Sequence, residues 1–173
     1  MLDLSIENAL NAQLEKEAFA SYSYLAMAVW CDQQSLDGCA QFFYRQSDEE
    51  RMHMMKILHY LIERNGHIHV PALQKPESEY VSIQEVFIST FQQEQSVTQS
   101  INELINMAQK VNDHSTQNFL QWYVSEQREE EATVMKILDR IKLIGEGALS
   151  LYYIDQEVDK INKLIMAAEA TGA

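Results

Sequence analysis

Residues 48–55 read Asp-Glu-Glu-Arg-Met-His-Met-Met and lie midway along a long helical pattern. On a helix, Glu50 and His53 are three residues apart and share one face. The same face carries the apolar residues Phe43, Met54, Ile57 and Leu61. A carboxylate and an imidazole that point into an apolar core are costly unless a partner compensates them. A metal ion with O and N ligands is one such partner, but Glu-x-x-His is common by chance, so the other helices must decide.

The composition is that of a helical globular protein. The 173 residues suffice for one domain with its own core, and we expect a single domain over residues 1–173. Only 5 Gly and 2 Pro interrupt the chain, which favours long helices over a β architecture with frequent turns. The formal net charge of −13 argues against a nucleic-acid partner, because such a surface needs a basic patch.

The sequence shows no targeting or membrane segment. Residues 1–5 lack a basic region followed by an apolar run, so no signal peptide is visible. The most apolar stretch, residues 24–31, is far shorter than the ~20 residues that span a bilayer. We therefore expect a cytoplasmic protein without a membrane partner, in which Cys31 and Cys39 are reduced thiols.

Apolar periodicity predicts an all-α fold with five helices, over residues of about 5–32, 39–64, 83–111, 116–144 and 149–168. Ser5 is expected to cap the first helix, and Ser82 with Glu85 the third. Asn65-Gly66 is expected to end the second helix with a left-handed residue. Residues 33–38 form a short turn, so the first two helices should be antiparallel.

Residues 67–82 connect the second and third helices and hold both prolines. About 16 extended residues cover roughly 55 Å, which exceeds the roughly 40 Å length of the second helix. The segment can therefore cross the whole bundle and leave the third helix parallel to the second. The alternative is a disordered linker between two helical hairpins, which would leave the apolar stripe of each hairpin unburied.

The short fifth helix carries one apolar stripe, made of Leu151, Ile154, Val158, Ile161 and Ile165. Four helices already close a bundle. We therefore expect this stripe to pack against a neighbouring subunit.

Each of the four long helices carries a polar side chain on its apolar face near its middle. In helix order the set is Glu17, Glu50 with His53, Glu94, and Gln127 with Glu130. One acid in an apolar stripe is noise, whereas one per helix at matching depth indicates a dimetal site in the bundle core. The four carboxylates would balance two divalent ions, and metal binding should release the protons that buried acids otherwise hold.

The chemistry of the ligands limits which metal ions are expected and suggests which residues bind each ion. Oxygen-rich ligation with one imidazole suits Fe or Mn, and Zn would compete. We expect Glu17 and His53 to hold one ion. Glu94 and Glu130 are expected to hold the second ion, with Glu50 as the bridge between the two.

Three further groups have open roles. Gln127 is a neutral amide, so it is a weak ligand, a hydrogen-bond donor to bound oxygen or water, or a satisfied core amide. Tyr24, two turns from Glu17, either serves the site as an electron or hydrogen-bond donor or is a core tyrosine. Glu49, Glu126 and Glu129 form either a solvated charge run or a third, weaker metal site that shares Glu130.

These motifs together resemble one protein family. They are residues 11–17 (Asn-Ala-Gln-Leu-Glu-Lys-Glu) with Tyr24, residues 49–53 (Glu-Glu-Arg-Met-His), Glu94, and residues 118–130, which end in Gln-Arg-Glu-Glu. Over nearly its whole length the chain resembles the prokaryotic non-haem ferritins with heavy-chain-type ferroxidase centres. The resemblance implies a four-helix bundle with a long crossover and a short fifth helix. It also implies a twenty-four-subunit cage that takes up Fe(II), oxidises it with dioxygen or hydrogen peroxide, and stores ferric mineral.

By motif match, the resemblance implies three iron positions. Site A is at Glu17, Glu50 and His53, site B at Glu50, Glu94 and Glu130 with Gln127 nearby, and site C at Glu49, Glu126, Glu129 and Glu130. Haem is not expected, because the haem-binding relatives have a second Glu-x-x-His where this chain has Gln127 and Glu130, and a methionine where it has Arg51. Animal heavy chains have acids that nucleate mineral at the positions where this chain has Met52 and Met55. They also have an acid in their three-fold channel at the position where this chain has Leu120.

Two other functions are compatible with these residues. A structural or signalling four-helix bundle would have the same stripes and bind no metal. A dimetal oxidase acting on an organic substrate would need a substrate pocket, whereas the helix faces look filled by bulky apolar residues.

Overall fold

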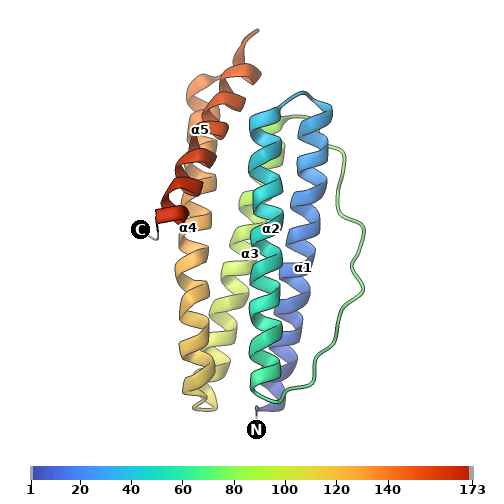
Figure 1. Cartoon of the computed structure of the whole chain (residues 1–173), viewed down its shortest axis with the longest axis vertical. Coiled ribbons are helices and arrows are strands. Elements are labelled where there is room, and N and C mark those ends of the chain that lie inside the picture. The colour runs from blue at the N-terminus through green and yellow to red at the C-terminus, as the bar shows by residue number, and fades with distance from the viewer. Residues whose placement is uncertain (1, 172–173) are drawn as a thin grey trace.

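The computed structural model describes residues 2–171, apart from the side chain of residue 169. It contains five helices: α1 (Leu4–Gln33), α2 (Asp37–Glu63), α3 (Ile83–Lys110), α4 (His114–Ile144) and α5 (Ser150–Thr171). Helices α1 and α2 form one antiparallel hairpin and α3 and α4 a second, and the two hairpins pack into a four-helix bundle (Figure 1). Helix α5 lies beside α2 and α4. The predicted all-α bundle is confirmed, and none of the described helices has the length and apolar character that crossing a bilayer requires.

The starts of α1 and α4 differ from the prediction. Asp3, not Ser5, caps α1, because its carboxylate accepts a hydrogen bond from the Ser5 amide at 2.9 Å. Asp113 caps α4 in the same way through the amide of Thr116, so this helix starts at His114 rather than near residue 116. In both cases an aspartate just ahead of the expected start satisfies a free amide of the first turn.

The predicted ends around the crossover are confirmed. Ser82 Oγ accepts from the Glu85 amide at 3.1 Å, and the Glu85 carboxylate accepts from the Val81 amide at 2.7 Å. At the end of α2, Asn65 takes the left-handed conformation with φ of 54°. Both features fix where the connecting segment leaves one helix and enters the next.

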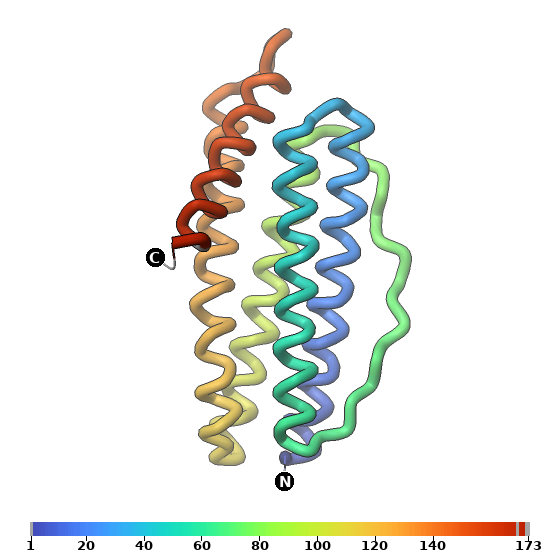
Figure 2. The backbone as a smooth tube through the Cα atoms, viewed as in Figure 1, coloured from blue at the N-terminus to red at the C-terminus, as the bar shows by residue number. Residues whose placement is uncertain are grey.

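The long connection between α2 and α3 runs along the outside of α1 and leaves α2 and α3 parallel (Figure 2). Two side chains of α1 tie it down. Asn11 donates to the His67 carbonyl at 2.9 Å and accepts from the His69 amide at 2.8 Å, and Glu7 accepts from the His67 amide at 3.0 Å. The connection therefore crosses the bundle as predicted, and the alternative of a disordered linker is wrong.

The prediction that the stripe of the fifth helix packs against a neighbouring subunit is wrong for most of its residues, whereas Leu151 is 55% exposed. Ile154, Val158 and Ile161 are buried inside this chain, in the same apolar cluster as residues of α2 and α4. Gly38 permits the close packing, because a Cβ there would lie 2.5 Å from the Asp155 carbonyl oxygen. Because Gly38 has no side chain, α5 can approach the start of α2 closely. The prediction assumed that four helices close the bundle and so did not include this contact.

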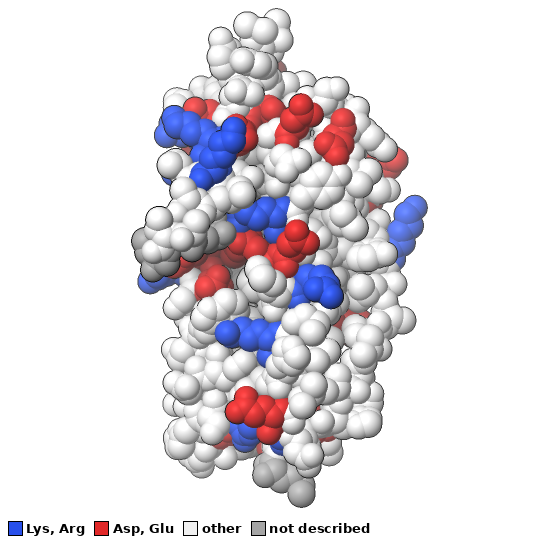
Figure 3. All heavy atoms as spheres, in the orientation of Figure 1, with Lys and Arg blue, Asp and Glu red and all other residues white. Residues whose placement is uncertain are grey.

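The exposed side of α5 carries both charged pairs and large apolar side chains, among them Tyr152 and Leu164. Lys163 pairs with Asp159 at 2.6 Å, and Arg140 of α4 pairs with Glu157 at 3.7 Å. Acidic and basic side chains are interspersed on this face of the molecule (Figure 3). Because such exposed pairs contribute little stability, the buried apolar stripe is what holds α5 in place.

The apolar core is divided into two clusters. One lies toward the α1–α2 turn and includes Tyr24, Phe42, Phe43 and Phe87 together with α5. The other lies toward the opposite end and includes Leu10, Leu14, Ile57, Leu120 and Tyr123. Cys31 and Cys39 belong to the first cluster as free thiols, and burial raises the pKa of Cys31 to about 12. The polar residues singled out from the sequence fall between the two clusters.

Candidate dimetal site

All six polar residues predicted to face inward are buried, with at most 9% of each side chain exposed. They are Glu17 of α1, Glu50 and His53 of α2, Glu94 of α3, and Gln127 and Glu130 of α4. Four carboxyl groups in one dry layer are costly without cations or protons to compensate them. The regular 3.6-residue period of each helix places them at one level, as the sequence predicts.

Glu17, Glu50 and His53 converge on one point, which we call the first position. One ligand atom from each lies within 4.8 Å of the others. His53 Nδ1 is 3.4 Å from Glu50 Oε2, and the Tyr123 hydroxyl fixes the backbone of His53 by donating to its carbonyl oxygen at 2.8 Å. Among residues 2–171, no other three His, Cys, Asp or Glu side chains come together in this way.

The first position holds three buried atoms without a hydrogen-bond partner when its acids are ionised: Glu17 Oε2, Glu50 Oε2 and His53 Nδ1. Unpartnered acceptors in a protein interior are rare because each is costly. Two carboxylate oxygens and an imidazole nitrogen facing one another match the ligand set of a divalent transition-metal ion.

Glu94 and Glu130, the acids predicted to hold the second ion, are called the second position here, and three of their oxygens accept hydrogen bonds from protein donors. Glu94 accepts hydrogen bonds from the Tyr24 hydroxyl on one oxygen and from Gln127 Nε2, at 3.0 Å, on the other. Glu130 Oε2 accepts from Gln46 Nε2 at 2.8 Å. Tyr24 and Gln127 are thus hydrogen-bond donors to an acid of the site, one of the roles that the sequence left open for each.

Sequence reasoning missed two buried glutamines. Gln13 donates to Glu17 Oε1 at 2.8 Å and accepts from Ser100 Oγ at 2.5 Å, whereas Gln46 donates to Glu130. Each glutamine lies four residues before a site glutamate on the same helix face, at 13 and 17 and at 46 and 50. A second polar residue on an apolar stripe, one turn from an acid, was the signal available for both.

Burial perturbs the acids in one direction. It raises the pKa of Glu17 and of Glu50 well above the usual range, and the charges of Glu50 and Glu94 raise the pKa of Glu17 and of Glu50 further, respectively. The pKa of Glu94 is also raised by burial, and that of Glu130 is raised to about 7, first by burial and then by Glu94. Without a cation, burial therefore favours the protonated forms of these carboxyl groups, and a bound cation would displace the protons.

The three flanking acids lie in different surroundings. Glu49 pairs with Arg45 at 2.5 Å, and Glu126 is half-buried. Both line a hollow of about 510 Å3 on the α2–α4 side that reaches His53. Glu129 is exposed, with Arg128 at 3.8 Å. The structure therefore places Glu49 and Glu126 around one hollow beside the first position and Glu129 at the surface.

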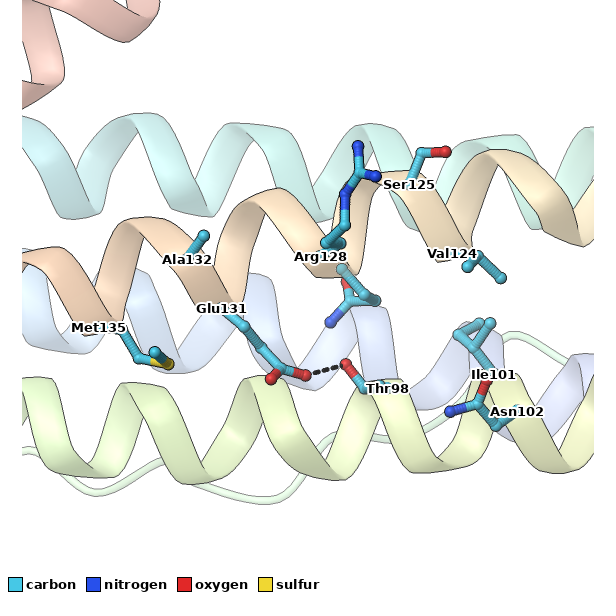
Figure 4. A pocket seen from close by; sticks show the side chains of 10 residues that line it. Thr98, Ile101, Asn102, Val124, Ser125, Arg128, Glu131, Ala132 and Met135 are labelled. Atoms are coloured by element: carbon cyan, nitrogen blue, oxygen red, sulfur yellow. Dashed lines mark hydrogen bonds between the residues drawn. The ribbon is translucent and has the colours of Figure 1, made fainter.

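A second hollow, of about 490 Å3, lies between α3 and α4. Figure 4 shows Thr98 of α3 and Glu131 of α4 pointing toward each other across it, with Thr98 donating to Glu131 at 2.5 Å. Asn102 of α3 and Arg128 of α4 also line the hollow. Gln127 also lines it. One hollow thus reaches His53 and the other reaches Gln127, so both sides of the buried layer lie near the surface.

Other residues from the sequence analysis lie outside the layer. Trp122 packs edge-on against His53, with ring centres 5.2 Å apart, and Lys56 lies 4.2 Å over its ring. Trp122 therefore packs beside the first position. Met52 and Arg51 are exposed on α2, and Leu120 is buried.

Comparison with known proteins places the chain in a family. The model for the ferritin-like domain matches residues 7–144. The bacterial non-heme ferritin of Campylobacter jejuni is 43% identical over 161 residues, covering 93% of this chain and 96% of that protein. The bacterial non-heme ferritin of an Escherichia coli strain is 38% identical over 162 residues, covering 94% and 98%. An open-pore ferritin of known structure from Archaeoglobus fulgidus superposes with a TM-score of 0.88 at 38% identity, covering 91% and 96%. With this similarity along nearly its whole length, and with acids of all four long helices buried in one layer, the chain belongs to the ferritin family.

Proposed function

We propose that this protein stores iron, and that it oxidises Fe(II) at the buried site before keeping it as ferric mineral inside a homo-oligomeric cage. Membership of the ferritin family supports iron binding, and the printed names of the relatives support storage. The observation that carries the oxidation step is the convergence of Glu17, Glu50 and His53 with unpartnered atoms facing one another. A bundle that bound nothing would gain no stability from such atoms.

Iron is the substrate of the proposed reaction. Glu17 and His53 hold the first Fe(II), Glu94 and Glu130 hold the second, and Glu50 bridges them. The four carboxylates neutralise two divalent ions, so the protons that burial retains leave as iron binds. Two Fe(II) ions give two electrons, which with two protons reduce dioxygen to hydrogen peroxide. Peroxide that takes two electrons and two further protons is reduced to water.

The protein's own donors orient the acid that would hold the second ion. Gln127 and Tyr24 each donate to a different oxygen of Glu94, and the second lone pair of each oxygen remains for an ion. Glu49, Glu126 and Glu129, with Glu130, would form a third iron site toward the α2–α4 side. An ion there has to compete with Arg45 for Glu49.

The assembly and its contents complete the proposal. The similar solved structures are ferritins, one of them described as an open-pore ferritin, and by that similarity we propose a cage of twenty-four copies. No haem is proposed, because Gln127 and Glu130 stand where a second Glu-x-x-His would be needed and Arg51 stands where a methionine would be.

Aerobic Fe(II) loading followed by size-exclusion chromatography tests the whole proposal. Many Fe(II) ions per subunit are added, and iron and protein are detected in the same eluate. Iron eluting with a very large protein particle is the expected result. Oxidised iron lost as precipitate, with protein eluting as a small species, would leave a dimetal bundle and remove the storage cage. Equal oxidation rates with and without protein would remove the oxidation site.

A further inference from the structure

We propose that α5 is linked to the second position by a hydrogen-bonded chain of side chains, Asn162–Arg45–Gln46–Glu130, which orients the Glu130 carboxylate and sets its affinity for the second ion. We call this chain the relay. Its role rests on the proposed function, since it requires Glu130 to hold an ion. Arg45, Gln46 and Asn162 are positioning residues, because they act on the ion through Glu130.

The relay is continuous from the surface helix to the site. Asn162 Oδ1 accepts from Arg45 Nε at 2.6 Å, and a terminal nitrogen of Arg45 donates to Gln46 Oε1 at 2.7 Å. Gln46 Nε2 then donates to Glu130 Oε2 at 2.8 Å. Asn162 and Gln46 are both buried, at 4% and 1% exposed, so these bonds do not compete freely with water.

Arg45 determines which way the Gln46 amide points. A guanidinium has only donors, so it can face only the oxygen of that amide. The amide nitrogen is therefore turned toward Glu130. Without Arg45 the amide can rotate and present its oxygen to the Glu130 carboxylate, so that two acceptors face each other. Arg45 thus acts on Glu130 through the Gln46 amide.

Arg45 also joins three parts of the molecule. Its Nε binds Asn162 of α5, one terminal nitrogen binds Gln46, and the other pairs with Glu49 at 2.5 Å. Arg45 therefore holds α5, Gln46 and Glu49 in one arrangement.

Contacts outside the relay also hold α5 against α2. Gly38 allows the Asp155 backbone to approach, and Asp155 Oδ1 accepts from the Cys39 amide at 2.9 Å. Asp155 and Asn162 are seven residues apart and their partners Cys39 and Arg45 are six apart, so both pairs span about two helical turns. Helices α5 and α2 therefore run side by side in the same direction over these turns, which brings Asn162 next to Arg45.

The direct test replaces Gln46 by leucine, which keeps a similar volume and removes the donor to Glu130. Co²⁺ is titrated into the assembled protein without dioxygen, and heat and visible absorption report each ion bound. We expect Gln46→Leu to weaken the second ion by about 10- to 100-fold, the usual effect of removing a hydrogen bond to a metal ligand. The affinity for the first ion should not change.

Gln13→Leu is the matched control, because Gln13 donates to Glu17 of the first position over the same distance of 2.8 Å. It should weaken the first ion and leave the second unchanged. If both leucine variants weaken both ions equally, the glutamines support only the fold and the relay is overturned.

Asn162 provides a test that does not disturb the buried layer. Asn162→Ala should weaken the second ion several-fold, and Asn162→Asp, which keeps an acceptor for Arg45, should restore it. Unchanged binding of the second ion in Asn162→Ala and Gln46→Leu overturns the relay while the proposed function stands. Failure of the unaltered protein to bind Co²⁺ at all overturns the proposed function, and the relay with it.

Discussion

The two halves of the buried layer differ in how many of their acid oxygens already accept hydrogen bonds from the protein. At the first position, Glu17, Glu50 and His53 present unpartnered atoms to one another. At the second, Glu94 and Glu130 are held by protein donors. Protein donors take one oxygen of Glu17 in the first half and three oxygens of Glu94 and Glu130 in the second, so a cation meets more unpartnered ligand atoms in the first. The comparison predicts that the first position fills before the second.

The largest effect should be on the stability of the metal-free protein as pH changes. The folded-state pKa of acids in both halves lies above the unfolded value, so the folded protein holds more protons than the unfolded chain. Stability must then fall as pH rises from about 4.5 through 7 and beyond. For Glu130, a rise from 4.5 to about 7 corresponds to on the order of 3 kcal/mol.

Thermal unfolding in the presence of a chelator measures this fall. The Tm at pH 8 should be below that at pH 5.5, and Co²⁺ should remove or reverse the difference by replacing the protons. A chelated protein that becomes more stable as pH rises would contradict the raised pKa values in both halves.

Loss of the residue shared by the two halves should be the most damaging substitution. Glu50→Ala is expected to slow the initial oxidation of Fe(II) by at least about 100-fold, because a ligand matters more than the partner of a ligand. Stopped-flow absorbance at two Fe(II) per subunit measures the rate. Glu63→Ala, an exposed acid at the end of the same helix, is the control. A Glu50→Ala protein with normal rapid oxidation would remove the bridging role.

Loss of His53 should impair the first position and spare the second. His53→Ala is expected to slow rapid oxidation by about 10- to 100-fold and to leave the fold and assembly intact. It should still bind one Co²⁺ at the second position, which calorimetry detects. His59→Ala, an exposed histidine on the same helix, should behave like the unaltered protein. Rapid oxidation unchanged by His53→Ala would mean that His53 is not part of the site.

The smallest effect should come from α5. Gly38→Ala forces a Cβ against the Asp155 carbonyl oxygen, and we expect it to cost about 1–3 kcal/mol in stability. Through the relay it should weaken the second ion and spare the first. Gly147→Ala is the control, because its Cβ would meet nothing closer than 3.5 Å. Equal weakening of both ions in Gly38→Ala would show that α5 does not distinguish the two halves.

The sequence was sufficient to place the acids of the layer but not their partners. Glu17, Glu94 and Glu130 were identifiable because each interrupts an apolar stripe with helical spacing. Gln46 carried the same signal, yet its contact with Glu130 joins α2 to α4 across 84 positions of the chain. The cap of α1 was missed for a smaller reason, since Asp3 and Ser5 are both good caps and only the backbone path decides between them.

By itself, the sequence determined five helices, a crossover long enough to span the bundle, and the side chains that share one level of its core. These follow from helix geometry, which is local and repeats every 3.6 residues. Only the tertiary structure decided that α5 packs within its own chain at Gly38 and that protein donors occupy more acid oxygens in the second half of the site than in the first. Both depend on how closely separate helices approach, and no local pattern specifies that distance.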